Sequence, residues 1–363
     1  MVSYSLEIHA KLFTESQLWS YHWSFLPSIT LHFSSGIMAT SLLEISNLRT
    51  YFFTPLGIVK AVDKVSMSVR SREVVGVVGE SGCGKSVMAR SILRLIPDPP
   101  GRIVGGEIKF MGDNLLKKSK QEMQKIRGNA ISMIFQEPMT SLNPVYTVGK
   151  QLAEVIIKHE DISKREAYNK AIEMLKMVRI PSPETRVKEY PFQMSGGMRQ
   201  RVIIAIALAC RPQLILADEP TTALDVTIQA QILNLIRDLE EELGTSMILI
   251  THDLGVIAET VQRVLVMYAG KVVEEASVEN LFNNPLHPYT EGLIWSVPSV
   301  EDEQSKDAGP LKEIPGIVPD LSRLPQGCCF YPRCHRRKDM CTEMIPELTE
   351  QGSGHFVSCL HYG

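Results

Sequence analysis

The chain has 363 residues, with 38 Lys and Arg against 41 Asp and Glu, which gives a formal net charge of −3 at pH 7. This balance excludes the basic footprint that nucleic-acid-binding proteins carry. Hydrophobic residues make up 44% of the chain, an ordinary value for a globular protein with room for two domains. Apart from a mixed patch near the N-terminus, no run of about 18 uncharged, mainly apolar residues occurs, so we expect the chain not to span a membrane by itself.

Residues 1–37 differ in composition from the rest of the chain. The stretch from Gln17 to Ser34 is rich in Trp, His, Ser and Phe and has no clean periodicity. It lacks the basic region, the apolar region and the small-residue cleavage site of a signal peptide. We expect a disordered or mistranslated extension, with Met38 as a plausible true start. A membrane-touching arm is the alternative.

Organised structure is expected from Leu42 onward. Leu42–Phe53 and Val59–Val69 are typical of strands, joined by a turn that contains Pro55 and Gly57. Next, Val74–Val78 is a short β-branched run that predicts a buried strand, and Val87–Leu93 is predicted to be a helix.

A glycine-rich loop joins that strand to that helix. Residues 79–86 match the pattern G-x-x-x-x-G-K-[ST], a phosphate loop in its required strand–loop–helix context. The glycines let backbone N–H groups point at phosphate oxygens, and the helix adds its positive N-terminal end. Lys85 should reach the β- and γ-phosphates, and the Ser86 hydroxyl should ligate Mg²⁺. The residues predicted to bind a nucleoside triphosphate here are Gly79, Glu80, Ser81, Gly82, Cys83, Gly84, Lys85, Ser86 and Val87.

A helical insertion is predicted at about residues 137–195. Ser163 and Glu166 have the spacing of a capping box at the start of a helix. We expect Pro181 and Pro183 to end that helix. Four apolar residues recur on one of its faces: Ala167, Ala171, Leu175 and Val178.

A second anion-binding element follows the insertion. Ser195, Gly196 and Gly197 precede an apolar helix at Arg201–Ala209, so a hydroxyl, exposed N–H groups and a helix dipole converge there. Because the chain already has a phosphate loop, a second γ-phosphate binder makes sense if it serves another subunit's nucleotide.

Two carboxylates end the next predicted strand. Leu214–Ala217 and Met247–Ile250 are continuous apolar runs that suit strands buried on both faces of a mainly parallel sheet. Asp218 should hold Mg²⁺, through water, and Glu219 should polarise the attacking water as general base. The alternative is that both are solvated charges at the end of a strand.

The order of these motifs resembles that of the ABC transporter ATPases over about residues 42–280. The resemblance implies an α/β fold: a P-loop NTPase core of the ABC type with an antiparallel β subdomain and a helical subdomain. It places the nucleotide-binding domain at 38–280 and the helical subdomain at about 137–195. Six motifs carry it: the loop 79–86, Gln136 in 134–138, the signature Ser195–Met198, the acidic strand 214–219, Asp225 in 222–225, and His252 in 250–253.

Residue roles carried over from the resemblance concern a composite site. In that family two such domains pair head to tail, and each nucleotide lies between the phosphate loop of one and the signature of the other. Gln136 is then expected to sense the γ-phosphate and to join Ser86 and Asp218 at Mg²⁺. His252 is expected to contact the γ-phosphate beside Glu219. Asp225 would lie at the dimer seam and belong to the nucleotide site. The signature residues of this chain, which would bind the nucleotide held by the phosphate loop of the other domain, are Ser195, Gly196, Gly197 and Met198.

Two positions need separate comment. An aromatic residue before the phosphate loop usually stacks on adenine; Phe52 fits that offset, with Tyr51 and Phe53 as rivals and a core role as the alternative. The signature usually carries Gln where this chain has Met198. The peptide-importer branch is similar to this chain there, so Met198 does not indicate an inactive site.

Features after the nucleotide domain resemble the dipeptide and oligopeptide importer ATPases. Residues 284–290 contain a His-Pro-Tyr segment, predicted to be a rigid turn leading into a helix, and residues 136–144 also match that branch. A polar, exposed linker is expected at 299–312. Residues 281–363 are therefore expected to be the C-terminal extension of that branch.

Five of the seven cysteines lie between residues 328 and 359. Four thiolates suit either Zn²⁺ or an iron–sulfur cluster, and free thiols are a further alternative. The similar arrangement in the peptide-importer tail is associated with a [4Fe–4S] centre, which the resemblance carries over to Cys328, Cys334, Cys341 and Cys359. Cys329 is an extra thiol that leaves the first ligand open.

The resemblance predicts an ATP-hydrolysing subunit of a peptide importer, using ATP and Mg²⁺ at the cytoplasmic face of the cell membrane. Its expected partners are a sister ATPase in a heterodimer (or a second copy in a homodimer), two permease subunits and, indirectly, an extracytoplasmic solute-binding protein. No nucleic acid is expected, although a soluble ABC-type ATPase of nucleic-acid or translation machinery is the rival function. Cargo selection is not written in this chain.

Overall fold

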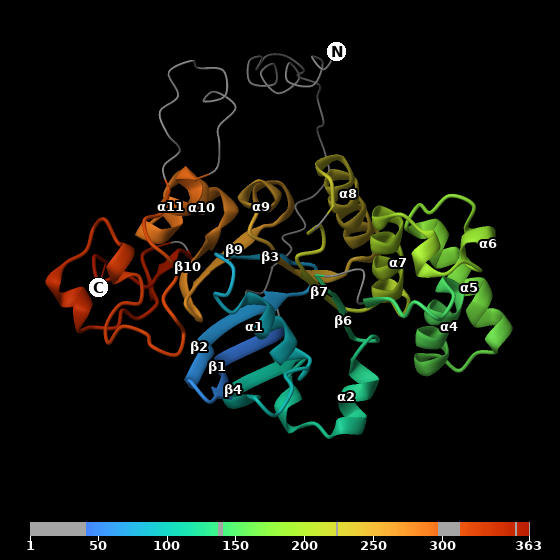
Figure 1. Cartoon of the computed structure of the whole chain (residues 1–363), viewed down its shortest axis with the longest axis horizontal. Coiled ribbons are helices and arrows are strands. Elements are labelled where there is room, and N and C mark those ends of the chain that lie inside the picture. The colour runs from blue at the N-terminus through green and yellow to red at the C-terminus, as the bar shows by residue number, and fades with distance from the viewer. Residues whose placement is uncertain (1–40, 137–140, 223, 297–312, 353, 363) are drawn as a thin grey trace, which may run out of the picture. The chain divides into compact units, whose positions relative to one another are not determined.

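A computed structural model describes residues 41–136, 141–222, 224–296, 313–352 and 354–362, which belong to one compact unit (Figure 1). The predictions for residues 1–37, for the linker at 299–312 and for the start of the helical insertion at 137–140 lie outside the described residues.

An antiparallel sheet of order β2-β1-β4-β5 forms the first layer. The predicted hairpin is confirmed, with Thr54 opposite Gly57 at its turn. Apolar side chains of β1, such as Leu43 and Leu48, are fully buried and share a hydrophobic cluster with Met88 of the first helix. The strands are β1 Ser41–Thr54, β2 Gly57–Arg70, β4 Gly101–Phe110 and β5 Asp113–Asn114.

The central sheet has the order β11-β12-β10-β9-β3-β8-β7-β6. Its pairs from β9 to β6 are parallel, as predicted from the continuous apolar runs. Every residue of β3, β6, β7 and β8 is buried. The strands are β3 Val74–Val78, β6 Ile131–Ile134, β7 Leu214–Asp218, β8 Ser246–Ile250, β9 Arg263–Tyr268 and β10 Lys271–Ser277.

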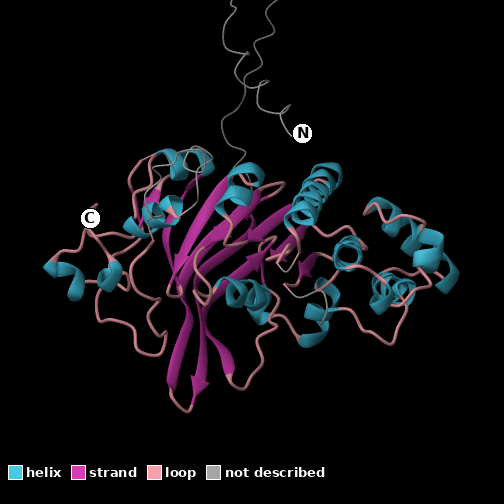
Figure 2. Ribbon diagram, turned by 45° about the horizontal axis from the view of Figure 1, so that its top comes forward, coloured by secondary structure: helices cyan, strands magenta, loops and turns pink. Residues whose placement is uncertain are grey.

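Side chains of β3 alternate between two hydrophobic clusters, as the period of two along a strand requires. Val75 and Val77 join the cluster of the antiparallel sheet, and Val74 and Val78 join the cluster of the later helices. Figure 2 shows the strands running together through the middle of the unit, with helices on both sides of them. The helices outside the insertion are α1 Lys85–Ile92, α2 Lys120–Ile126, α8 Val226–Leu243, α9 Leu254–Thr260 and α10 Val278–Asn283.

The helical insertion consists of α4 (Val148–His159), α5 (Lys164–Met177) and α6 (Pro183–Arg186), and it leads into α7 (Gly196–Leu208). The capping box of Ser163 and Glu166 is confirmed at the start of α5. The four predicted face residues are all fully buried: Ala167, Ala171, Leu175 and Val178.

The predicted end of α5 is wrong. The helix stops at Met177, before Pro181, because Arg179 adopts left-handed backbone with φ of 58°. The N–H of Ile180 then bonds Leu175 O at 3.0 Å, and that of Arg179 bonds Lys176 O at 2.8 Å, the two bonds of a Schellman motif. Pro183 starts α6 as its first residue.

The C-terminal extension adds strands to the central sheet, which the sequence did not indicate. β12 (Phe356–Val357) pairs antiparallel with β10, and β11 (Thr349–Glu350) pairs with β12. The predicted turn and helix after residue 284 are confirmed as α11 (Pro288–Trp295), with His287 at its N-cap. Short 3₁₀ helices lie at Tyr331–Arg333 and Asp339–Thr342. Among the described residues, no helix is both long enough and apolar enough to cross a bilayer.

Candidate active site

The phosphate loop between β3 and α1 depends on its glycines. Gly79 has φ of 149°, and a Cβ there would lie 2.2 Å from Met267 O. Gly84 has φ of 105°, and a Cβ there would lie 2.1 Å from Ala61 O. Both distances are shorter than any real contact, so only glycine allows the loop to follow this path between two strands.

Lys85 concentrates positive charge inside the loop. Its side chain is buried, and Nζ donates to Gly79 O at 2.6 Å and Glu80 O at 3.0 Å. The loop therefore holds an ammonium group and the N-terminal end of α1 at one place, which is the electrostatic requirement for binding a triphosphate.

Ser86 and Asp218 meet at the predicted magnesium position. The Ser86 hydroxyl donates to Asp218 Oδ1 at 2.7 Å, which joins the start of α1 to the end of β7. Asp218 is fully buried, its Oδ2 has no hydrogen-bond partner among the residues that the structure describes, and burial raises the pKa of the carboxyl. A buried carboxylate oxygen without a partner, beside a hydroxyl, fits a Mg²⁺ ion, whose charge would remove the cost of that burial.

Two of the three predicted catalytic residues contact the carboxylate of the third, Glu219. Gln136 Nε2 donates to Glu219 Oε2 at 2.8 Å, and His252 Nδ1 lies 3.4 Å from Oε1. These residues follow β6, β7 and β8, whose carboxyl ends meet at one edge of the parallel sheet. The alternative of freely solvated strand-end charges does not describe Glu219, because both of its oxygens have protein partners.

Sequence reasoning missed one partner of Glu219. The Thr222 hydroxyl donates to Glu219 Oε2 at 2.8 Å. Its spacing of three residues from Glu219 is a local signal that could have suggested the contact. With Gln136 and His252 it fixes the orientation of the carboxylate.

The signature and the predicted seam residue are both helix caps on the surface. Ser195 is the exposed N-cap of α7 and accepts from the Met198 N–H at 3.4 Å. Asp225 is the exposed N-cap of α8 and accepts from the Ile228 N–H at 3.0 Å. A Cβ on Gly197 would lie 2.8 Å from Ile228 Cγ2, so the two helix starts pack closely.

The three aromatic candidates on β1 have different environments. Phe52 packs on Gly101, where a Cβ would lie 2.8 Å from its ring. The Tyr51 hydroxyl donates to Asp63 at 2.7 Å, and burial, followed by this bond, raises the pKa of Tyr51 to about 12. Phe53 is 46% exposed, with the guanidinium of Arg102 6.0 Å from its ring centre. Phe53 is therefore the most accessible of the three.

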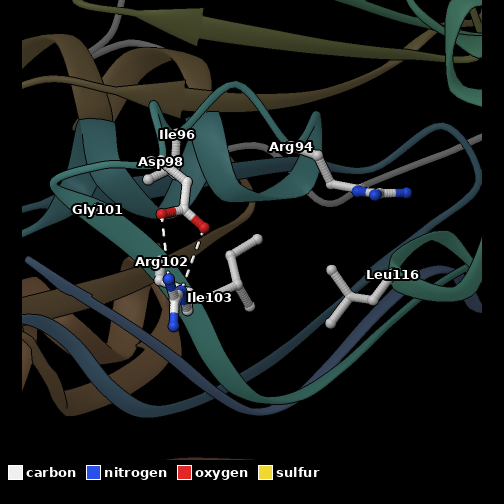
Figure 3. Close-up of a pocket in the computed structure, with 7 residues that line it drawn as sticks. All are labelled: Arg94, Ile96, Asp98, Gly101, Arg102, Ile103 and Leu116. Atoms are coloured by element: carbon white, nitrogen blue, oxygen red, sulfur yellow. Dashed lines mark hydrogen bonds and ion pairs between the residues drawn. The ribbon is translucent and has the colours of Figure 1, made fainter. Parts of the chain in front are cut away.

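A pocket of about 320 Å³ lies beside this strand, on the antiparallel sheet (Figure 3). Asp98 and Arg102 form an ion pair of 3.1 Å at its wall, and the figure shows Arg94 and Leu116 on the other side. None of the predicted nucleotide-binding residues lines the pocket, so it is separate from the candidate active site.

Two comparisons by sequence agree with this geometry. A family model described as "ABC transporter" matches residues 62–222, and one described as "Oligopeptide/dipeptide transporter, C-terminal region" matches 273–341. A probable peptide ABC transporter ATP-binding protein of Sinorhizobium fredii, y4tR, is 53% identical over 91% of this chain and 97% of its own length. The chain belongs to the ATP-binding proteins of the ABC transporters. Two Bacillus subtilis relatives support this: the oligopeptide transport ATP-binding protein AppD (51% identical, 89% of this chain, 97% of AppD) and the dipeptide transport ATP-binding protein DppD (47% identical, 88% and 94%).

Solved structures match the ATPase core. The ATP-binding cassette MJ0796, solved as a dimer in a post-hydrolysis state with ADP and Pi, has a TM-score of 0.59 at 30% identity. The match covers 65% of this chain and 98% of that chain. A second dimeric structure of the same cassette has a TM-score of 0.58 at 31% identity. The expected P-loop ATPase fold of the ABC type is thereby confirmed.

The cysteines of the extension surround Cys341 without forming a ready-made metal cage. Within the described ranges, no group of three or more His, Cys, Asp or Glu side chains is arranged to hold a metal ion. The thiols of Cys328, Cys334 and Cys359 each interact electrostatically with Cys341, and burial raises the pKa of each of the three. Burial is the largest influence on each of these pKa values, and the backbone at Phe330, Arg336 and His361 only partly opposes it.

Proposed function

We propose that this ABC ATPase is the energy-coupling subunit of an importer for dipeptides or oligopeptides. The observation that carries the ATPase part is the convergence of Gln136 and His252 on Glu219, next to the Ser86–Asp218 contact. The match of residues 273–341 to the peptide-transporter C-terminal region supports the peptide cargo, as do the printed names of the relatives AppD and DppD.

The hydrolysis step follows from the positions of this chain's own groups. Lys85 and the loop N–H groups bind the β- and γ-phosphates, and the Glu219 carboxylate accepts a proton from the attacking water. Gln136, Thr222 and His252 hold that carboxylate in place. Bound Mg²⁺, held by Ser86 and Asp218 with Gln136 nearby, would neutralise phosphate charge.

A second ATPase subunit would complete each site. Ser195 and Asp225 are exposed helix caps, and two such surfaces facing each other would place a signature opposite a phosphate loop. The dimeric state of the solved cassettes supports this arrangement. The partner is a sister ATPase in a heterodimer, with a homodimer as the alternative. ATP stabilises the closed dimer and hydrolysis reopens it.

The transport partners are two permease subunits, with an extracytoplasmic solute-binding protein delivering cargo to them. The ATPase pair would lie at the cytoplasmic face of the membrane against these permeases. The segment 136–144 is proposed to carry motion to them, and its residues 137–140 lie outside the described part of the chain.

Adenine would stack on an aromatic side chain of β1. The ring of Phe52 is packed on Gly101, so accessibility favours its rival Phe53 as the stacking surface.

The cysteines Cys328, Cys334, Cys341 and Cys359 are proposed to ligate a structural [4Fe–4S] cluster, with Zn²⁺ as the alternative. The donor chemistry of four cysteine sulfurs supports thiolate ligation. A visible absorbance band in anaerobically purified protein would support iron–sulfur, and a colourless, zinc-loaded protein would reject it.

The variant Glu219→Gln tests the proposed chemistry. It should retain ATP binding, lower kcat by at least about a hundredfold because the proton acceptor is lost, and accumulate an ATP-bound dimer. Glu241→Gln, on the exposed end of α8, is the matched control and should behave as the wild type. Steady-state ATPase rates and size-exclusion chromatography with ATP provide the readouts. Normal hydrolysis by Glu219→Gln would contradict the general-base role.

A further inference from the structure

Glu80, the second residue of the phosphate loop, is held by two residues of the C-terminal extension. The Glu80 backbone N–H donates to the Tyr289 hydroxyl at 2.8 Å. Its carboxylate accepts two hydrogen bonds from Arg333, with Nη1 2.6 Å from Oε2 and Nη2 2.9 Å from Oε1. These contacts join positions 253 residues apart in the chain. The extension therefore contacts the ATP site directly.

Arg333 is also held by contacts outside the phosphate loop. Its side chain is only 4% exposed, and Nε donates to Pro315 O at 2.9 Å. The rings of Tyr268 and Phe330 lie 5.8 and 6.0 Å from the guanidinium carbon. The hydrogen bonds to Glu80 raise the pKa of Arg333. A guanidinium held in this way loses little freedom when it pairs with a carboxylate.

The negative charge of the Glu80 carboxylate opposes the binding of a triphosphate, and the positive charge of Arg333 offsets it. A loop that binds a triphosphate normally concentrates positive charge, and a carboxylate on that loop repels the ligand. Glu80 is partly exposed, at 29% of its side chain, so its charge is not fully screened by water. The bidentate pair with Arg333 offsets that charge and holds the carboxylate against the extension.

We infer that Arg333 is a positioning residue of the phosphate loop, supplied by the C-terminal extension, and that it keeps ATP affinity high by offsetting the charge of Glu80. The Tyr289 hydroxyl accepts a hydrogen bond from the Glu80 N–H. The extension therefore holds the backbone of the loop as well as its carboxylate. The inference rests on the proposed ATPase function, because it assigns the charge balance of that same nucleotide site.

The test compares both partners of the ion pair in the full chain assembled with its partner subunits. Arg333→Gln should raise KM and the equilibrium Kd for ATP about tenfold, equivalent to ~1.4 kcal/mol of binding free energy, with kcat changed less than about twofold. Glu80→Gln should act in the opposite direction and lower Kd at low salt, because it removes a negative charge from the loop and leaves the positive charge of Arg333 nearby. The double variant should return Kd to within about threefold of the wild type.

Opposite changes in the Kd for ATP distinguish a residue that balances charge at the loop from an ion pair that only fastens the extension. If the pair only fastened the extension, both single variants would weaken ATP binding alike, and that outcome would overturn the inference. Arg336→Gln is the matched control, because it breaks an ion pair within the extension, with Glu291 of α11, without reaching the loop; its Kd should stay unchanged. If Arg333→Gln fails to fold, Glu80→Gln alone decides, since weaker ATP binding there contradicts the inference. A wild-type assembly without ATPase activity would refute the proposed function instead.

Discussion

Glu219 adopts left-handed backbone, with φ of 47°, at the point where β7 ends. A non-glycine residue in this region costs about 1 kcal/mol or more. Here the conformation is held by the bond from the Glu219 N–H to Ile250 O at 2.9 Å and by the side-chain bonds from Gln136 and Thr222. The cost is consistent with a carboxylate that must leave the strand direction to face the phosphate loop.

The aromatic pair on β1 provides a prediction at the same scale. Phe53→Ala should raise KM for ATP about tenfold or more, because stacking on a base contributes roughly 1–3 kcal/mol. Phe52→Ala should instead lower thermal stability, because it removes packing on Gly101. Nucleotide titrations and thermal denaturation of both variants provide the comparison. A loss of ATP affinity in Phe52→Ala alone would return the stacking role to Phe52.

Among the elements, α11 is capped by an unusual residue. His287 is fully enclosed, its Nδ1 accepts the Tyr289 N–H at 3.0 Å, and burial lowers the pKa of His287 to about 3. An acceptor at Nδ1 requires the neutral ring. The cap therefore holds Tyr289, and through it the phosphate loop, only while His287 is unprotonated.

Acid should consequently weaken this part of the fold. The folded-state pKa lies below the unfolded value of 6.5, so the stabilisation is fully present above about pH 6.5 and is lost as the pH falls toward 3. The free energy of unfolding should fall by up to about 1.4 kcal/mol per pH unit in that window. His287→Asn keeps an acceptor for the cap and should reduce the drop in Tm between pH 7.5 and 5.5. His335→Asn, an exposed histidine of the same extension, should leave that drop unchanged; an equal drop in the His287 variant and the wild type would contradict this origin.

Elements with strong local patterns were predictable, and those fixed by distant partners were not. The β-branched run Val74–Val78 and the capping box at Ser163 depend on a few neighbouring residues, and the structure places both as expected. The end of α5 was mispredicted because Arg179, rather than glycine, takes the left-handed position. β12 is two residues long and is defined by its pairing with β10, so no local periodicity marks it.

The candidate site shows the same division. The motifs identified the loop, Asp218, Glu219 and His252 by residue type and order. Arg333 and Tyr289 could not be found in this way, because their role depends on a fold that brings an extension back to a loop 253 residues earlier. A His-Pro-Tyr segment predicts a turn, but it carries no sign that the tyrosine hydroxyl contacts the phosphate loop.

At the scale of the whole molecule, the chain presents one complete phosphate loop and one outward-facing signature. The signature lies where the helical insertion leads into α7, and the proposed general base Glu219 follows strand β7 of the central sheet. Figure 1 shows α7 beside α4–α6 of the insertion. The exposed cap at Ser195 therefore belongs to the surface available to a partner subunit.

A substitution at that surface should separate binding from turnover. Ser195→Arg should leave ATP binding by the isolated chain unchanged and should lower the ATPase rate of the assembled pair by about a hundredfold, the typical cost of removing a transition-state contact. Ser163→Arg, at the exposed N-cap of α5, is the matched control for loss of a cap alone. Undiminished turnover by the assembled Ser195→Arg variant would show that the signature does not complete a neighbouring site.

The ion pair between Glu80 and Arg333 can form only after both residues have been synthesised. Chains grow at about 5–20 residues per second, so the ribosome makes Arg333 roughly ten to fifty seconds after Glu80, given their separation of 253 residues. During that interval a nascent loop carries its carboxylate without the compensating guanidinium. An ATP site in that state is expected to have the lower affinity proposed for the Arg333→Gln variant.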